Sequence, residues 1–136
     1  MNEDRLPVFV YGTLRPGEKN YPRFLQGKTR RETPAFAEGR LFFVRDGGYP
    51  YVLPGDGRVA GDLMELTPAT YDATLSGLDR LEDYHPREEA GSLYLRRSCP
   101  VTVASGRRRM AWIYFWNGPA EAGDRIPSGD FRRRRG

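Results

Sequence analysis

A short apolar run near the N-terminus, Val8 to Tyr11, constrains the fold more than any other part of the sequence. Consecutive apolar and aromatic residues without polar alternation are typical of a strand that is buried on both faces. The run ends at Gly12, and Arg15-Pro16-Gly17 has the residue types of a turn. We therefore expect a buried strand followed by a loop whose backbone N–H groups converge on one point, where they can bind a carboxylate or a phosphate.

Further strand patterns follow, separated by turns rich in glycine and proline. The segment Tyr49 to Leu53 is short and contains a proline, which predicts an edge strand or a loop. Asp46-Gly47-Gly48 predicts a hairpin before it, Pro54-Gly55-Asp56-Gly57 predicts a tight turn after it, and Asn117 to Gly129 predicts a surface loop. We expect the other strands at residues 35–44, 59–66, 93–103 and 110–116.

One segment has the pattern of a well-defined helix. Thr67 is a good N-cap, Pro68 occupies the first helical position, and His85-Pro86 stops the pattern, so we expect a helix from residue 68 to about Asp83 or Tyr84. Five or six strands with a single late helix predict an α+β fold with a mostly antiparallel, barrel-like sheet rather than a doubly wound sheet.

This helix carries a carboxylate on its apolar face. On a helical wheel Tyr71, Leu75 and Leu78 share one stripe, and Glu82 falls between Tyr71 and Leu75. Burial raises the pKa of a carboxyl toward the range that suits proton transfer near neutral pH. Two interpretations stay open from periodicity alone: an acid/base in a pocket, or a residue at the fraying end of the helix that contacts a lysine or arginine. Asp83 lies about 100° away on the wheel, so we expect it at the surface.

Other chemical signals are weaker. The spacing Gly12 to Gly17 matches a phosphate-binding P-loop only in part, because Glu18 stands at the lysine position and Asn20 offers no metal-binding hydroxyl. The only histidine, His85, precedes a proline, and together with the only cysteine, Cys99, it cannot form a zinc site of the usual nitrogen and sulfur type. Cys99 is more typical of a packed core residue than of a nucleophile.

The composition fits one domain over residues 1–136. No apolar run approaches the roughly 18 residues of a membrane span, and a single cysteine suits a reducing compartment, so we expect a cytoplasmic protein without a membrane partner. The net charge of +4 arises from the arginines at 107–109 and 132–135. We interpret residues 130–136 as a basic, disordered tail; contact of this tail with nucleic acid or anionic lipid is the weaker alternative.

Two segments together carry a family resemblance. The sequence resembles the small bacterial branch of the γ-glutamyl cyclotransferase-like (AIG2-like) family in Val8-Phe9-Val10-Tyr11-Gly12-Thr13-Leu14 and in Leu78-Asp79-Arg80-Leu81-Glu82-Asp83-Tyr84. Gly48-Tyr49-Pro50, Val59 to Met64 and Tyr94-x-Arg96 also match, and the resemblance covers most of residues 6–116. Asp83 departs from the family pattern, which has glycine after the glutamate.

The resemblance implies a small β-barrel with flanking helices and an enzyme that cleaves a γ-glutamyl amide by cyclisation, releasing 5-oxoproline and the free amine. It implies that backbone N–H groups of Gly12 to Leu14 hold the glutamyl α-carboxylate and that Glu82 is the acid/base, with no metal, cofactor or covalent intermediate. Tyr49, Tyr94 and Tyr114 are candidates for pocket walls or a hydroxyl donor, with ordinary packing as the alternative. The expected substrate-binding residues are Tyr11, Gly12, Thr13, Leu14, Tyr49, Tyr94 and Tyr114.

Two functional hypotheses follow. The first is a cyclotransferase that acts on a small-molecule γ-glutamyl amine or γ-glutamyl amino acid. The second is a non-catalytic member with the same fold, which binds a small carboxylate or serves as an interaction module. No motif identifies the leaving amine or the oligomeric state.

Overall fold

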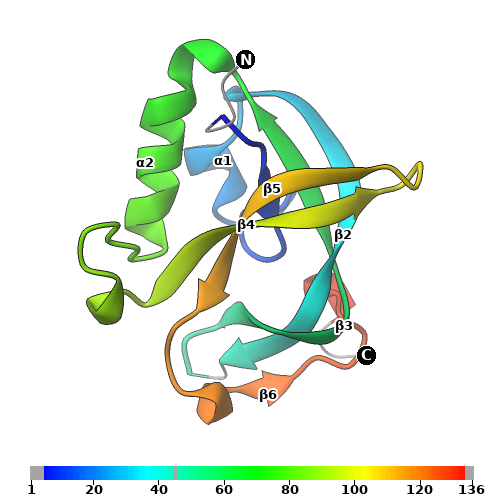
Figure 1. Cartoon of the computed structure of the whole chain (residues 1–136), viewed down its shortest axis with the longest axis vertical. Coiled ribbons are helices and arrows are strands. Elements are labelled where there is room, and N and C mark those ends of the chain that lie inside the picture. The colour runs from blue at the N-terminus through cyan, green and yellow to red at the C-terminus, as the bar shows by residue number, and fades with distance from the viewer. Residues whose placement is uncertain (1–4, 45, 134–136) are drawn as a thin grey trace.

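The computed structural model describes residues 5–44 and 46–133 and contains a closed β-barrel with two α-helices on its outside (Figure 1). The strands are β1 (Val8–Val10), β2 (Thr29–Val44), β3 (Tyr49–Leu66), β4 (Tyr94–Val103), β5 (Arg108–Trp116) and β6 (Asp124–Arg125). The α-helices are α1 (Tyr21–Phe24) and α2 (Tyr71–Leu81), and 3₁₀ turns lie at Pro68–Thr70, Glu89–Gly91, Ala120–Ala122 and Phe131–Arg133. In the described ranges no helix has the length and apolar character needed to cross a membrane.

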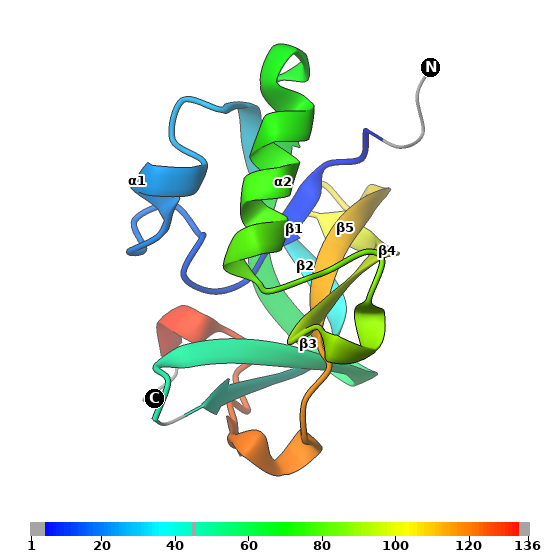
Figure 2. The ribbon, with the colours of Figure 1, turned by 90° about the vertical axis from the view of Figure 1, so that its left-hand side faces the viewer.

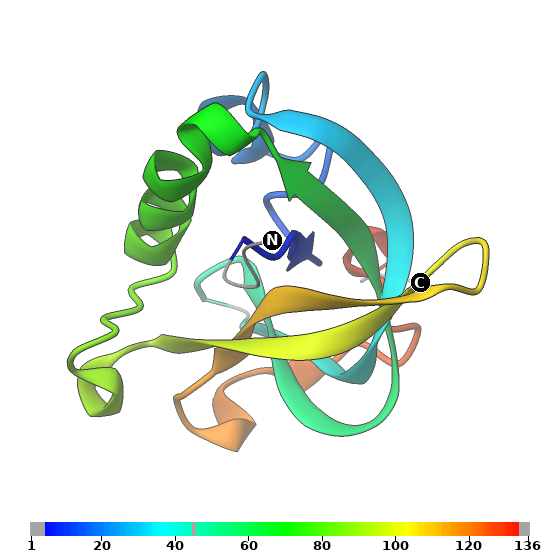
Figure 3. The same ribbon diagram turned by 45° about the horizontal axis from the view of Figure 1, so that its top comes forward.

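The barrel closes because β3 pairs with both β1 and β2. The strand order is β3-β1-β5-β4-β2, β2 returns to β3, and β6 extends the sheet beside β2. These pairs are antiparallel except β1 with β5, in which Val8 lies opposite Trp112. Figure 3 shows α2 against the outside of this curved sheet. The predicted α+β class and mostly antiparallel barrel are therefore confirmed.

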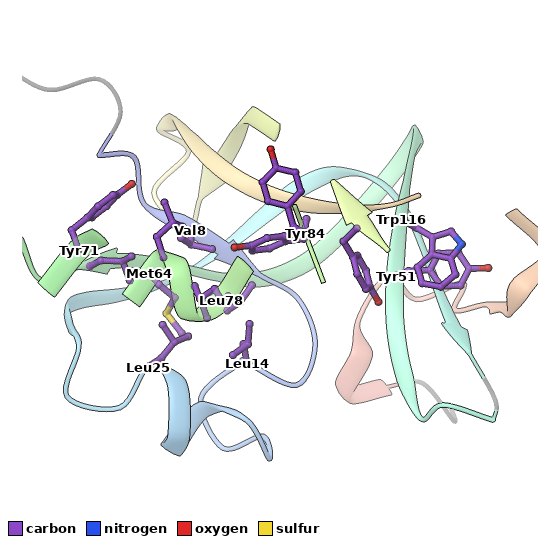
Figure 4. Packing of buried hydrophobic residues seen from close by; sticks show 14 residues of the cluster. Val8, Leu14, Leu25, Tyr51, Met64, Tyr71, Leu78, Tyr84 and Trp116 are labelled. Atoms are coloured by element: carbon purple, nitrogen blue, oxygen red, sulfur yellow. The ribbon is translucent and has the colours of Figure 1, made fainter. Parts of the chain in front are cut away.

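Strand β1 lies inside the sheet and is buried on both faces, as predicted. Because side chains alternate along a strand, its residues contribute to two hydrophobic clusters. Val8 and Val10 belong to the cluster beneath α2, while Phe9 and Tyr11 belong to the cluster inside the barrel. Figure 4 shows the first cluster, in which Leu78 of α2 packs near Val8 and Met64.

Strand β3 continues through the segment in which the sequence predicts a turn. Residues 54–57 lie opposite Gly39 alone, because Arg40 pairs with Leu53 and Glu38 pairs with Arg58. Gly55 and Gly57 have φ values of 153° and 128°, which allow the strand to bulge and bend without reversing its direction. The prediction of a tight turn here is wrong, because cross-strand pairing on both sides of the bulge keeps the chain in the sheet.

The segment Tyr49 to Leu53 is part of a strand rather than a loop. Tyr51 is fully buried between two aromatic rings, with its ring centroid 5.0 Å from that of Phe42 and 4.6 Å from that of Trp116. Strand β2 also begins earlier than predicted, at Thr29, because the residues that follow pair with the end of β3. The side chains of Arg30 and Arg31 are exposed, whereas Glu32 is half-buried.

Helix α2 is shorter than predicted. Its first turn, Pro68–Thr70, is 3₁₀, and Thr67 makes no side-chain capping hydrogen bond. The helix ends at Leu81, and Glu82 is the residue that caps its C-terminus. The chain leaves the helix there because Asp83 adopts a left-handed conformation with φ of 55°. Figure 2 shows α2 beside α1 on the same side of the barrel.

The segment after β5 is more ordered than the sequence predicts. Residues 117–129 contain the short strand β6 as well as loops. The expectation of a disordered tail is wrong for residues 130–133, because Phe131 is buried in the cluster inside the barrel and Asp130 pairs with Arg15. An aromatic side chain that reaches the core offsets the repulsion of its arginine neighbours. The rest of the expected tail, residues 134–136, lies outside the described residues.

Candidate active site

A pocket of about 250 Å³ lies where the loop after β1, the C-terminal end of α2 and the β2–β3 hairpin meet. Its lining includes all the site residues selected from the sequence, which are Tyr11, Gly12, Thr13, Leu14, Tyr49, Glu82, Tyr94 and Tyr114. No sequence pattern indicated the other described lining residues as part of a site, and these are Phe9, Val10, Lys19, Asn20, Gly47, Pro50, Leu81 and Leu93. The sequence-selected residues therefore meet at one place, although they come from distant parts of the chain.

The loop after β1 is held by a buried guanidinium. Arg15 Nε donates to Asp62 Oδ2 at 2.8 Å, and Arg15 Nη1 donates to Asp130 Oδ1 at 2.9 Å. The backbone N–H of Arg15 also donates to Gly12 O at 3.0 Å. A buried charge that is paired on two sides fixes the loop in one conformation. The sequence pattern around Arg15 predicts only a turn, so this role of its side chain does not follow from the sequence.

The residues of the same loop that line the pocket include Tyr11, Gly12, Thr13 and Leu14. Within residues 5–44 and 46–133 the N–H groups of Gly12, Thr13 and Leu14 have no hydrogen-bond acceptor. A Cβ atom on Gly12 would lie 2.4 Å from Pro50 Cγ, so only glycine lets this backbone approach the β2–β3 hairpin so closely. Neighbouring N–H groups without acceptors form a site that an anionic oxygen can occupy.

Asn20 orients the side chain of Thr13. The Asn20 backbone N–H donates to Thr13 O at 2.9 Å, and its side-chain Nδ2 donates to Thr13 Oγ1 at 2.8 Å. Because the threonine hydroxyl accepts this hydrogen bond, its own proton is available to an acceptor in the pocket. Thr13 therefore adds a fourth donor to the three backbone N–H groups.

Glu82 lines the pocket from the end of α2. Its side chain is half-buried, and among the described residues it forms no ion pair with a lysine or arginine. Desolvation by the surrounding protein raises the pKa of Glu82 from 4.5 to about 7. The pocket thus combines a carboxyl that titrates near neutrality with a set of hydrogen-bond donors. The neighbouring Asp83 is exposed, as predicted.

Three of the four tyrosine hydroxyls in the pocket are used by the protein itself. Tyr11 Oη donates to Tyr114 O at 2.7 Å, Tyr94 Oη donates to Pro50 O at 2.7 Å, and Tyr114 Oη donates to Asp79 Oδ1 at 2.6 Å. Burial raises the pKa of each of these three hydroxyls. They are therefore rigid walls of the pocket rather than proton donors to a ligand. The hydroxyl of Tyr49 has no hydrogen-bond partner among the described residues.

A second carboxylate supports the pocket from outside its lining. Asp79 lies three residues before Glu82 on α2 and accepts hydrogen bonds from Arg96 at 2.9 and 3.3 Å. The Arg96 guanidinium stacks over the rings of Trp112, at 4.5 Å, and Tyr84, at 5.4 Å. Asp79 belongs to the segment Leu78 to Tyr84, which carries the family resemblance and also contains Glu82. This shared segment is the sequence signal that points to Asp79.

The remaining sequence candidates lie outside the pocket. His85 pairs with Asp83 at 2.6 Å, and both side chains are exposed. Cys99 is half-buried on β4, where burial raises the pKa of its thiol. Within the described ranges no group of three His, Cys, Asp or Glu side chains has an arrangement suited to a metal ion.

Comparisons with known proteins relate the whole described chain to one group. Residues 8–133 match the family model described as "Gamma-glutamyl cyclotransferase, AIG2-like". A γ-L-glutamyl-butirosin B γ-glutamyl cyclotransferase from Niallia circulans is 34% identical over 110 residues, which span 81% of this chain and 66% of that protein. A Methanocaldococcus jannaschii protein, provisionally named a γ-glutamylcyclotransferase, is 30% identical over 131 residues, or 95% of this chain and 98% of that protein. The solution structure of ytfP from Escherichia coli matches with a TM-score of 0.65 and 26% identity, over 95% of this chain and 98% of that one.

Proposed function

Because this chain belongs to the γ-glutamyl cyclotransferase, AIG2-like family, we propose that it cleaves a γ-glutamyl amide by intramolecular cyclisation to 5-oxoproline and a free amine. One observation carries the proposal. The carboxyl of Glu82, with its pKa raised to about 7, lines the same pocket as the N–H groups of Gly12 to Leu14, which lack acceptors among the described residues. Cyclisation needs a proton acceptor and an anion site near one another, and the proposal assigns these two roles to groups that line one pocket.

In this proposal the loop after β1 binds the glutamyl α-carboxylate. The N–H groups of Gly12, Thr13 and Leu14 and the hydroxyl of Thr13 donate to its two oxygens. The methylene groups lie against the aromatic walls of the pocket. Binding at one end folds the glutamyl chain so that its α-nitrogen lies near its own γ-carbonyl carbon, which lowers the entropic barrier to ring closure.

Glu82 transfers the proton. As a carboxylate it takes a proton from the substrate α-ammonium group, and the resulting amine attacks the γ-carbonyl carbon. The bond from that carbon to the leaving nitrogen breaks as Glu82 gives its proton to that nitrogen. The ring nitrogen, which still carries two protons after the attack, loses one of them, and the released amine takes up this second proton and leaves as an ammonium ion. No water is consumed, and the two products contain all the atoms of the substrate. A pKa of about 7 suits a group that must both accept and donate a proton near neutrality.

The alternative function is a binding module that holds a small carboxylate without turnover. The N–H groups of Gly12 to Leu14 and the hydroxyl of Thr13 suit this role equally well. The two functions differ in what Glu82 does, because a binding module has no use for a desolvated carboxyl beside an anion site.

Release of 5-oxoproline from a panel of γ-glutamyl amides tests the proposal. We expect release by the wild type and a loss of roughly 100-fold or more in Glu82→Gln, the range typical of general acid–base groups. Glu88→Gln is the matched control, because Glu88 is exposed and does not line the pocket, and it should retain wild-type activity. Unchanged activity in Glu82→Gln would remove this residue from the mechanism. Binding of γ-glutamyl compounds by a wild type that releases no 5-oxoproline would establish the binding module instead.

A further inference from the structure

The pocket lining includes a cation, Lys19, that the proposed reaction does not use. Of the described residues that line the pocket, only Lys19 and Glu82 carry a formal charge. Lys19 is exposed, and among the described residues it forms no ion pair or hydrogen bond through its side chain. A lysine at the edge of a pocket with no protein acceptor is available to an anionic group of a ligand.

The surroundings of Lys19 hold its backbone in place. On one side, Asn20 is bonded to Thr13 through both its backbone N–H and its side chain. On the other side, the backbone N–H of Glu18 donates to Arg15 O at 2.9 Å, and the Glu18 carboxylate lies 3.5 Å from Arg132 Nε. The neighbouring acid is therefore paired with another cation, and within residues 5–44 and 46–133 no other acid pairs with Lys19.

The depth of each group indicates which part of a substrate Lys19 meets. Gly12 and Leu14, which supply backbone donors for the glutamyl carboxylate, are buried, whereas Lys19 is exposed. A substrate whose carboxylate occupies the buried donors extends toward the exposed edge with its other end. That end is the amine released by the reaction.

Building on the proposed function, we infer that Lys19 determines specificity by favouring substrates whose leaving amine carries an anionic group, such as a carboxylate. The same charge disfavours leaving amines that carry a second positive charge, since like charges at the pocket edge repel. The substrate class assigned is thus a γ-glutamyl amide with an acidic leaving group.

Three substrates of similar length test this inference by differing in charge alone: γ-glutamylglycine, γ-glutamylglycinamide, and the mono-γ-glutamyl amide of ethylenediamine. We expect kcat/KM for wild type to decrease in that order. In Lys19→Gln the preference for γ-glutamylglycine over γ-glutamylglycinamide should fall about fivefold, the upper range for a solvent-exposed ion pair. Lys19→Arg should retain the preference, and Lys19→Glu should reverse the order. Rising ionic strength should weaken the preference in the wild type but not in Lys19→Gln.

Lys28→Gln is the matched control, because Lys28 is the only other lysine in the chain, is exposed and does not line the pocket. It should leave all three kcat/KM values unchanged. An equal decrease for the three substrates in Lys19→Gln would overturn the inference and assign Lys19 to the glutamyl carboxylate. An unchanged preference would also overturn it.

Failure of the proposed function gives a different result. If the wild type released no 5-oxoproline from any of the three compounds, their Kd values would be measured by calorimetry for the wild type, Lys19→Gln and Lys28→Gln. A preference for γ-glutamylglycine that depends on Lys19 would support the charge selection even without turnover. Equal Kd values for the three compounds would contradict it.

Discussion

The Tyr114 hydroxyl donates a hydrogen bond of 2.6 Å to Asp79, which lies one helical turn before Glu82 on α2. Asp79 also forms an ion pair of 2.9 Å with Arg96 on β4. One carboxylate therefore ties the C-terminal end of the helix to two strands of the barrel. Tyr114 and Glu82 both line the pocket. The hydrogen bond from Tyr114 to Asp79 therefore holds the end of the helix, and with it Glu82, in place relative to Tyr114.

Removing the charge of Asp79 should destabilise the protein. The side chains of Asp79 and Arg96 are only 14% and 15% exposed, so Asp79→Asn leaves a largely buried guanidinium without its anion. We expect the free energy of unfolding, measured in urea, to fall by about 2–4 kcal/mol. Asp72→Asn, an exposed position on the same helix, should change it by less than about 0.5 kcal/mol. Equal effects of the two substitutions would contradict the proposed connection.

Neutralising Glu82 should stabilise the protein at high pH only. Its folded pKa of about 7 exceeds the unfolded value of 4.5, so the folded state holds this proton more tightly. The stability that comes from the protonated group is complete below about pH 4.5 and is lost as pH rises through 7. We expect Glu82→Gln to exceed the wild type in unfolding free energy by about 1–3 kcal/mol at pH 8, and to match it near pH 4. Thermal unfolding at both pH values measures this, and a pH-independent difference would refute it.

The pH dependence of activity should report the same group. Because Glu82 must be ionised to accept the proton, kcat/KM should rise through about pH 7 rather than near 4.5. His85 is the only histidine in the chain, so His85→Gln is the matched control. His85 is exposed and outside the pocket, so its replacement should leave the rise of kcat/KM through about pH 7, the acidic limb of the pH profile, in place. Disappearance of that limb in His85→Gln would assign it to the histidine.

The left-handed conformation of Asp83 should favour glycine there. A φ of 55° is strained for a residue with a Cβ atom, although aspartate tolerates it better than alanine. We expect Asp83→Ala to lower the unfolding free energy by about 1 kcal/mol and Asp83→Gly to leave it unchanged or raise it. The lost ion pair with His85 is exposed and contributes little. If chemical denaturation gave Asp83→Ala a higher unfolding free energy than Asp83→Gly, the result would contradict the left-handed conformation that ends the helix at this position.

A side chain at Gly12 should disturb the pocket. Its Cβ would lie 2.4 Å from Pro50 Cγ, so Gly12→Ala must displace the loop or the β2–β3 hairpin. We expect a loss of about 1–3 kcal/mol in stability together with weaker binding of γ-glutamyl ligands, measured by calorimetry. Gly77→Ala is the contrasting variant, because its Cβ would approach only Phe24 Cδ1, at 4.0 Å. It should stabilise α2 by about 0.5–1 kcal/mol and leave binding intact.

Local periodicity was sufficient to predict the two elements that bring Glu82 and the loop after β1 to the pocket. The continuous apolar run identified β1, and the helical wheel placed Glu82 on the face toward the pocket, because both patterns depend only on neighbours along the chain.

Features set by distant pairing could not be predicted. The bulge at residues 54–57 exists because β2 pairs with β3 on both sides of it, and no local pattern encodes that register. Phe131 was overlooked among arginines, although a single aromatic residue in a charged run is a sign of an anchored segment. The partners of the Tyr94 and Tyr114 hydroxyls, which exclude them as donors to a ligand, are likewise long-range contacts.

The contact between Arg15 and Asp130 has a consequence for protein synthesis. These residues are 115 positions apart, so a nascent chain contains the first strand and its loop long before it contains the second acceptor for Arg15. While the ribosome is still translating the β4–β5 hairpin, the guanidinium has at most Asp62 as its partner. The second ion pair of this loop can therefore form only in chains that have already been extended to Asp130.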